Sequence, residues 1–201
     1  GVGTAALCYA HRVPVNHVMA LEQQPEMAAL ARDNVGANGL EDRITIVEGD
    51  LLDAPGVLEP DSFQHIMANP PYVAAAQGDP SMDPARVASH VEGDAGLADW
   101  ISFAHARLVH KGSLTLIYDP ARLDELMVTL QGCFGGVIVY PLWPSAGSEK
   151  GGKDAKRIIV QARKGVRTAA RICAGLVLHE ADGSYTAAAE RILRDGKMLS
   201  V

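Results

Sequence analysis

The chain has 201 residues, of which 48% are apolar and 21% charged, so it can bury a sizeable core and is not intrinsically disordered. Its formal net charge of −6 argues against a general nucleic-acid-binding protein. No apolar run approaches the roughly 20 residues of a membrane-spanning helix, and the opening residues lack a signal-peptide pattern. The three cysteines have no metal-ligand spacing, which predicts reduced thiols in a cytoplasmic protein without a metal site.

Strand-like and helix-like segments alternate along the chain. The predicted strands are His17–Leu21, Arg43–Glu48, Gln64–Ala68, Ser113–Tyr118, Gly136–Leu142 and Arg157–Ala162. The predicted helical segments are Ala5–Ala10, Pro25–Asn38, Leu97–His110, Ala121–Leu130 and Ala187–Arg194. This alternation predicts an α/β protein with a doubly wound, mostly parallel sheet. Val73–Asp94 interrupts it with a long stretch of little periodicity, which is typical of a functional or mobile loop.

Polar and glycine residues stand where a ligand would meet the carboxyl edge of such a sheet. Gly1 and Gly3 form a turn that leads into a helix, where a ligand can approach the backbone. Glu22 ends the first predicted strand, at the position from which an acid accepts hydrogen bonds from a ribose. Asp50 follows the next strand and precedes Leu51. Each feature alone also fits an ordinary turn or a solvated acid, but their combination favours a nucleotide-binding site.

The strongest motif is Asn69-Pro70-Pro71-Tyr72, directly after the strand Gln64–Ala68. Two prolines stiffen the backbone and remove two N–H donors, which leaves carbonyl groups free to accept. The Asn69 amide oxygen and the Pro70 carbonyl can then accept both hydrogens of one NH2 group. Tyr72 offers a flat face to a planar base or amide. We expect Glu22, Asp50 and Asn69 to lie along one edge of a parallel sheet.

Together these features resemble the class I S-adenosylmethionine-dependent methyltransferases that act on amines. More closely, most of the chain resembles the bacterial tRNA1(Val) adenine-N6 methyltransferase family. The supporting stretches are Gly1–Thr4, Ala20–Glu22, Asn34–Asn38, Gly49-Asp50, Asn69–Tyr72, Pro141–Pro144, Lys156–Val160, Leu176–Glu180 and Tyr185-Thr186. The Asn-Pro-Pro-Tyr motif is specific for amino methylation, whereas the tail pattern favours this family over its relatives.

The resemblance implies a Rossmann-like fold, S-adenosylmethionine as cofactor, and methylation of adenine N6 in an RNA, with tRNA favoured. It assigns cofactor binding to Gly1, Gly3, Glu22, Gln23, Asp50, Leu51 and Asn69, and catalysis to Asn69, Pro70, Pro71 and Tyr72. Family members carry a strand before the glycine turn that this sequence does not contain. We therefore expect residues 1–201 to form a single, N-terminally truncated methyltransferase domain.

Basic residues concentrate in the segment 147–171, ahead of a C-terminal tail, 172–201. We predict that this segment contacts RNA phosphates. The candidate residues are Lys150, Lys153, Lys156, Arg157, Arg163 and Lys164. Alternation along the strand predicts Arg157 and Arg163 on one face. A solvated loop and strand edge would have the same composition.

Two other functions stay open at this point. A protein-glutamine N5 methyltransferase of the release-factor type would share the Asn-Pro-Pro-Tyr motif, because a glutamine amide is also a planar NH2 group. The basic segment and the tail argue for RNA instead. A catalytically inactive RNA-binding scaffold would bind no S-adenosylmethionine, and the intact motif argues against it.

Overall fold

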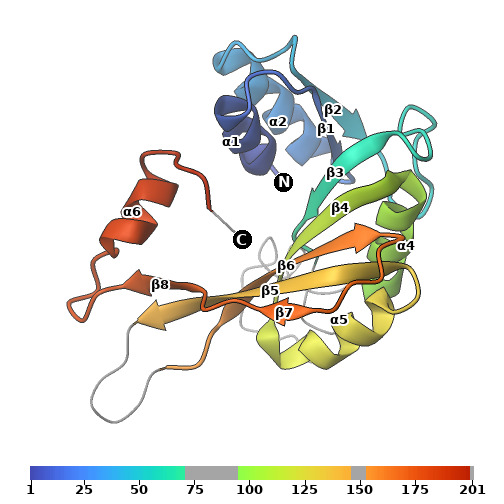
Figure 1. The fold of residues 1–201 in the computed structure, drawn as a ribbon. Coiled ribbons are helices and arrows are strands. Elements are labelled where there is room, and N and C mark those ends of the chain that lie inside the picture. The colour runs from blue at the N-terminus through green and yellow to red at the C-terminus, as the bar shows by residue number, and fades with distance from the viewer. Residues whose placement is uncertain (71–94, 146–152, 200–201) are drawn as a thin grey trace, which may run out of the picture. The chain divides into compact units, whose positions relative to one another are not determined.

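The computed structural model describes residues 1–70, 95–145 and 153–199 (Figure 1). The chain divides into two compact units. The first unit consists of Gly1–Leu58 together with Arg191–Ser200, and the second is mainly Glu59–Glu190. The expectation of a single domain stays a prediction.

The first unit contains a two-stranded parallel sheet with two helices packed on it. Its elements are α1 (Thr4–Arg12), β1 (Val18–Glu22), α2 (Pro25–Ala37) and β2 (Ile44–Glu48). Helix α2 begins with Pro25 at its first position, where the missing N–H costs no hydrogen bond. It ends before Gly39, whose φ of 61° stops the helix. Buried Ala6, Ala10 and Val35 pack against the sheet and give the unit its own core.

The second unit is built on a six-stranded mixed sheet. Its strands are β3 (Phe63–Ala68), β4 (Leu108–Tyr118), β5 (Phe134–Ser145), β6 (Arg157–Lys164), β7 (Arg171–Ile172) and β8 (Leu176–His179). The hydrogen-bonded order is β3-β4-β6-β5-β7, and β8 also pairs with β5 (Figure 1). Its helices are α4 (Leu97–Arg107), the 3-10 turn η2 (Pro120–Arg122) and α5 (Leu123–Leu130). Helix α6 (Ala187–Leu193) begins in this unit, and its residues from Arg191 onward belong to the first unit.

Helices α4 and α5 supply the apolar cover of this sheet. Ile101 and Leu126 are almost completely buried in one cluster with Leu116, Val139 and Val160 from the central strands. Apolar residues at helical spacing face alternating apolar residues of the strands, so one continuous core forms. This core holds the carboxyl ends of β3 and β4 in fixed register, with Ala68 opposite Leu116.

All the predicted strands and helices are present, with ends that differ by a few residues. Parallel pairing joins β1 to β2, β3 to β4, and β5 to both β7 and β8. Strand β6 is antiparallel to β4 and β5. It follows β5 after a segment shorter than the dozen or so residues that a parallel crossover needs. Strands β7 and β8 were not predicted, because two and four residues are too few to show a period.

Candidate functional site

The glycine turn that opens α1 has the backbone geometry a close-approaching ligand requires. Gly3 precedes the helix with φ 83°, a conformation that side chains disfavour. A Cβ atom at this position would lie 3.3 Å from the Cβ of Ala31 in α2. Asn34, also in α2, donates from Nδ2 to the Val2 carbonyl across 3.0 Å and so fixes the turn. Gly3, the residue that precedes α1, has no side chain with which to cap the N–H groups of the first turn.

Glu22 lies beside this turn, as its place at the end of β1 predicts. Its side chain is only 13% exposed, and its Oε2 contacts the amino nitrogen of Gly1. Oε1 accepts a hydrogen bond from the backbone N–H of Gln24 across 2.9 Å. The carboxylate is therefore held in one orientation next to the glycines.

Asp50 is fixed at the same edge of the β1–β2 sheet. The Gly49 N–H donates to the Glu22 carbonyl across 3.0 Å, which places the segment after β2 next to the end of β1. Asp50 Oδ2 accepts from Nε2 of Gln23 across 2.7 Å, and its Oδ1 accepts from the Leu52 N–H across 2.9 Å. The structure thus brings Gly1, Gly3, Glu22, Gln23 and Asp50 together in the first unit.

Two residues that stabilise this edge of the sheet were not predicted from the sequence. Asn34 belongs to one of the stretches that carry the family resemblance, but no function was predicted for it. Its contact with the glycine turn is tertiary, and the sequence pattern does not indicate such a contact. Pro55 packs so closely over Gly49 that a Cβ atom on the glycine would collide with the proline ring. A glycine directly before the acidic residue was the visible sign of this close approach.

Asn69 is exposed at the carboxyl end of β3 in the second unit, and Pro70 behind it is almost fully buried. A buried proline without an N–H fixes the backbone on which Asn69 is presented. Pro71 and Tyr72 lie outside the described residues. The expectation that Asn69 shares an edge with Glu22 and Asp50 stays a prediction, because Asn69 follows a strand of the other sheet.

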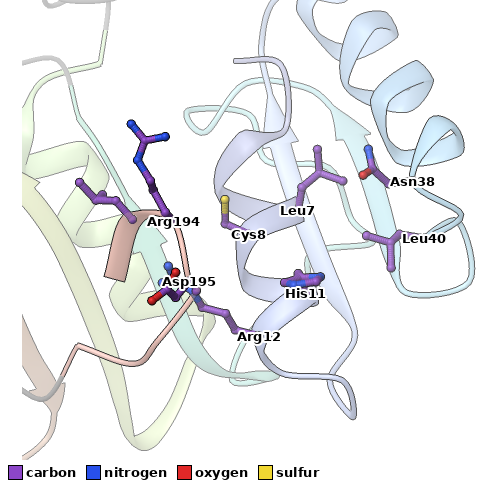
Figure 2. A pocket seen from close by; sticks show the side chains of 10 residues that line it. Leu7, Cys8, His11, Arg12, Asn38, Leu40, Arg194 and Asp195 are labelled. Atoms are coloured by element: carbon purple, nitrogen blue, oxygen red, sulfur yellow. The ribbon is translucent and has the colours of Figure 1, made fainter. Parts of the chain in front are cut away.

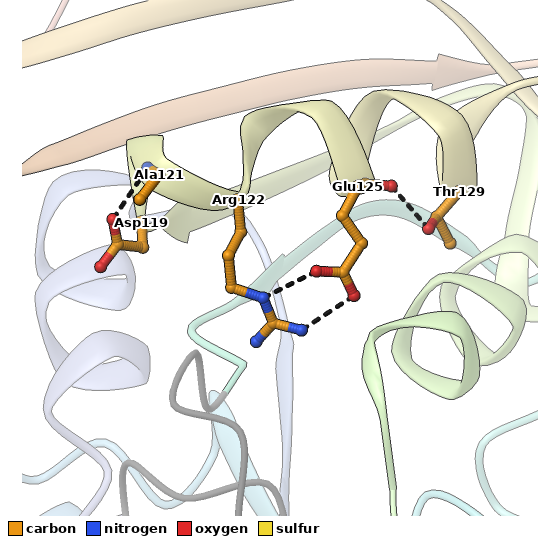
Figure 3. A network of polar contacts seen from close by, with 5 residues as sticks. All are labelled: Asp119, Ala121, Arg122, Glu125 and Thr129. Atoms are coloured by element: carbon orange, nitrogen blue, oxygen red, sulfur yellow. Dashed lines mark hydrogen bonds and ion pairs between the residues drawn. The ribbon is translucent and has the colours of Figure 1, made fainter. Parts of the chain in front are cut away.

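An acidic residue at the end of the neighbouring strand was missed. Asp119 directly follows β4, and its Oδ1 accepts from the Ala121 N–H across 3.0 Å (Figure 3). Its Oδ2 lies 3.7 Å from Nη1 of Arg157 at the start of β6. Arg122 forms a two-bond ion pair with Glu125 at 2.7 and 2.8 Å on the adjoining helix (Figure 3). The sequence Asp119-Pro120 is typical of a turn, so Asp119 was not predicted as a site residue. It nevertheless follows a strand, in the same way that Asp50 follows β2.

The basic segment divides between the two ends of the second sheet. Lys153 and Lys156 are exposed just before β6, and Arg157 begins it beside Asp119. Because β6 is antiparallel to β4, its other end, with Arg163 and Lys164, lies near the start of β4. The burial pattern of β6 alternates, in keeping with Arg157 and Arg163 on one face. Lys150 lies outside the described residues.

Lys164 has a structural role at the end of β6, next to the start of β4. Its Nζ donates to Asp61 Oδ1 across 2.6 Å and to the Leu108 carbonyl across 2.7 Å. The Lys164 ammonium group lowers the pKa of the Asp61 carboxyl group, through the hydrogen bond first and the charge second. These contacts tie β6 to the segment before β3.

A groove of 390 Å³ lies elsewhere in the first unit (Figure 2). His11 and Arg12 from the last turn of α1 line it, together with Leu193 and Asp195 of the C-terminal segment. The Arg12 guanidinium donates to the Ile192 carbonyl across 2.6 Å. Since this groove is at the end of α1 opposite Gly3, it is separate from the predicted cofactor edge.

Cys8, Cys133 and Cys173 are free cysteines in the structure. Within residues 1–70, 95–145 and 153–199, no three His, Cys, Asp or Glu side chains are grouped as a metal site would require. The described helices are also too short or too polar to cross a membrane.

Comparison with known proteins places the chain among methyltransferases. A family model described as the methyltransferase small domain matches residues 1–139. The tRNA1(Val) (adenine(37)-N6)-methyltransferase of Aeromonas hydrophila is 27% identical over 187 residues, which cover 92% of this chain and 74% of the relative. A release factor glutamine methyltransferase of Deinococcus radiodurans is 33% identical over 137 residues, 65% of this chain and 47% of the relative.

Among solved structures, a predicted O-methyltransferase from Agrobacterium tumefaciens matches with a TM-score of 0.78 and 28% identity. The match covers 100% of this chain and 87% of the other. Together with the mixed sheet and its helices, it confirms the predicted α/β, Rossmann-like fold of the class I methyltransferases.

Proposed function

We propose that this chain, which belongs to the methyltransferase small domain family, methylates the exocyclic N6 amine of an adenine in tRNA. Its methyl donor is S-adenosylmethionine. The observation that carries the choice of an amine is Asn69, exposed at the end of β3 on a buried proline and followed in sequence by Pro71 and Tyr72. We also propose a cytoplasmic location, in keeping with the three free thiols.

The first unit has residues that fit the cofactor. The left-handed Gly3 lets the turn pack closely against Ala31 of α2, and the first N–H groups of α1, which Gly3 does not cap, follow it. Glu22 is oriented to accept from ribose hydroxyl groups, and the Gln23–Asp50 pair offers a fixed polar frame for an adenine. Leu51 would add an apolar contact. When bound, the cofactor supplies an electrophilic methyl group on a sulfonium.

Asn69 acts on the amine that receives the methyl group. The lone pair of an aromatic amine is delocalised into the ring, so the amine is a weak nucleophile. When the Asn69 side-chain oxygen and the Pro70 carbonyl each accept one N–H, the nitrogen is favoured in a more tetrahedral form and its lone pair has a fixed direction. This contribution is positioning, which needs no strong general base. Tyr72 would stack on the target base.

RNA is favoured as the substrate by charge and by similarity. Lys153, Lys156 and Arg157 gather at the end of the second sheet that also holds the carboxyl ends of β3 and β4. We therefore assign the phosphate contacts to these residues, and not to Lys164, which binds Asp61 at the far end. An adenine in an RNA loop can also be turned out of its stack at lower cost than one in a duplex.

Methyl transfer to a release-factor glutamine remains the second candidate, because a relative of that kind is 33% identical over 65% of this chain. The test is to incubate the protein with S-adenosylmethionine labelled in its methyl group and with either total tRNA or a release factor. The proposal predicts label in tRNA, recovered as N6-methyladenosine after digestion to nucleosides. Label in the release factor alone would support the glutamine enzyme, and label in a 2′-O-methyl nucleoside would contradict amine methylation. An inactive scaffold would transfer no label and bind no cofactor.

A further inference from the structure

The tail of the chain forms a rigid aromatic hairpin that the proposed methyl transfer does not use. Strand β8 pairs in parallel with the end of β5, with Ser145 opposite His179 (Figure 1). The chain then turns back, and Tyr185 forms an antiparallel bridge with His179. The two rings stack with centroids 4.7 Å apart and planes inclined by 24°. Tyr185 is nevertheless 39% exposed.

The turn between the two rings is held by its own polar contacts. Asp182 Oδ1 accepts from both the N–H and the hydroxyl group of Ser184, at 2.9 and 2.6 Å. These hydrogen bonds lower the pKa of the Asp182 carboxyl group. Gly183 adopts φ 88°, and its carbonyl accepts from Nδ1 of His179 across 3.1 Å. The hairpin therefore fixes the His179 ring, on which Tyr185 rests.

The base of the hairpin is anchored to its neighbours on both sides. Thr186 donates from its N–H to the Leu178 carbonyl across 2.9 Å and from its hydroxyl group to the Val177 carbonyl across 2.8 Å. The same hydroxyl oxygen accepts from the Ala189 N–H in α6. Before β8, Trp143 donates from Nε1 to the Ala174 carbonyl across 2.9 Å. An exposed ring on so constrained a backbone loses little entropy when a partner binds.

The hairpin itself carries the exposed acids Glu180 and Asp182, and the basic residues that precede β6 indicate which partner it meets. Strand β5 pairs with β8 on one side and with β6 on the other. Exposed Lys153 and Lys156 lead into β6 at Arg157, which lies opposite Leu142 of β5. An exposed tyrosine stacked on a partly buried histidine, one strand away from the strand that this basic stretch precedes, fits a single-stranded nucleic acid, because bases stack on the ring while phosphates meet the cations.

We infer that the stacked His179–Tyr185 pair is a platform on which an unpaired base of the RNA substrate stacks during methyl transfer. This inference rests on the proposed function. It adds a contact to a second base, separate from the adenine that is methylated. Stacking on an aromatic side chain tolerates any base, so the platform contributes affinity and placement of the loop more than sequence choice.

The test measures binding of a fluorescently labelled tRNA anticodon stem-loop to the full chain and to two variants at one position. Tyr185→Phe keeps the aromatic ring, whereas Tyr185→Leu keeps apolar bulk without it. We expect Tyr185→Phe to bind like the wild type and Tyr185→Leu to bind about 5- to 150-fold more weakly. S-adenosylmethionine affinity and the melting temperature check that both variants are folded, and KM should rise in Tyr185→Leu more than kcat falls.

Abasic stem-loops identify the contact itself. In the wild type, removing the base that stacks should weaken binding, and this loss should disappear in Tyr185→Leu because the two changes remove one interaction. If the wild type methylates RNA and Tyr185→Leu binds every stem-loop as the wild type does, base stacking on the His179–Tyr185 pair is contradicted. The proposed methylation of RNA is then unaffected. If the wild type neither binds nor methylates RNA, both are wrong.

Discussion

Gln23 and Asp50 follow different strands, yet the Nε2 of Gln23 donates to Oδ2 of Asp50 across 2.7 Å. The bond joins the ends of β1 and β2, where Glu22 and Glu48 are paired in register. Asp50 also accepts from the Leu52 N–H through its other oxygen. The carboxylate is thus oriented before any ligand arrives, which reduces the entropy lost on binding.

Replacing Asp50 tests its role toward the cofactor. Asp50→Ala should weaken S-adenosylmethionine binding about tenfold or more, since a hydrogen bond to a charged group is worth about 1.5–3 kcal/mol. Gln23→Ala should cost less, and the double variant should match Asp50→Ala because Gln23 acts through Asp50. Calorimetric titration gives the affinities, with the exposed Asp53→Ala as control. An unchanged Kd in Asp50→Ala would remove this residue from the cofactor site.

Gly3 and Gly39 form a matched pair, because both have positive φ but only Gly3 has a close neighbour. An alanine at either position should lower the free energy of unfolding by about 1–2 kcal/mol through backbone strain. Gly3→Ala should in addition abolish cofactor binding, because its methyl group would press on Ala31 and shift the turn. Denaturant unfolding and cofactor titration measure the two effects. Equal cofactor affinities in the two variants would exclude the glycine turn from the site.

The sequence was informative where function follows directly from strand ends. Glu22 and Asp50 each stand after a predicted strand, so their shared edge could be foreseen from parallel pairing alone. The sequence could not predict that the basic segment 147–171 divides between the two ends of the second sheet. This division depends on β6 running antiparallel between β4 and β5. The hairpin of His179 and Tyr185 is set by tertiary pairing of a four-residue strand, which leaves no periodic signal.

The Asp61–Lys164 ion pair predicts a pH-dependent part of the stability. The pKa of Asp61 is lowered below its usual value of 3.8 by Lys164. Its contribution is therefore present above that value and is lost as pH falls through the lower, folded-state pKa. Asp61→Asn keeps a side chain that tolerates the positive φ of this position but removes the charge. The melting temperature of this variant should be below that of the wild type at pH 7, with the gap closing in acid. A gap that stays constant into strong acid would contradict the assignment.

The two ends of β6 offer a matched test of the RNA contacts. Lys153, Lys156, Arg163 and Arg167 are all exposed, but the first two precede β6 and the last two lie at or beyond its far end. Neutralising Lys153 and Lys156 to Gln should reduce the salt dependence of tRNA binding by up to about two counterion units. Neutralising Arg163 and Arg167 should leave it near the wild-type value. Equal effects of the two pairs would mean that net charge alone governs binding.

The central claim is that Asn69 positions the amine that is methylated, and its replacement tests this most directly. In the complete protein, Asn69→Ala should lower methyl transfer to tRNA by about two orders of magnitude or more while the Kd of S-adenosylmethionine stays within a few fold. The exposed Gln64 of the same strand provides the control, and Gln64→Ala should be nearly as active as the wild type. The measurement is single-turnover methyl transfer at saturating cofactor and tRNA. A rate in Asn69→Ala close to that of the wild type would contradict the account.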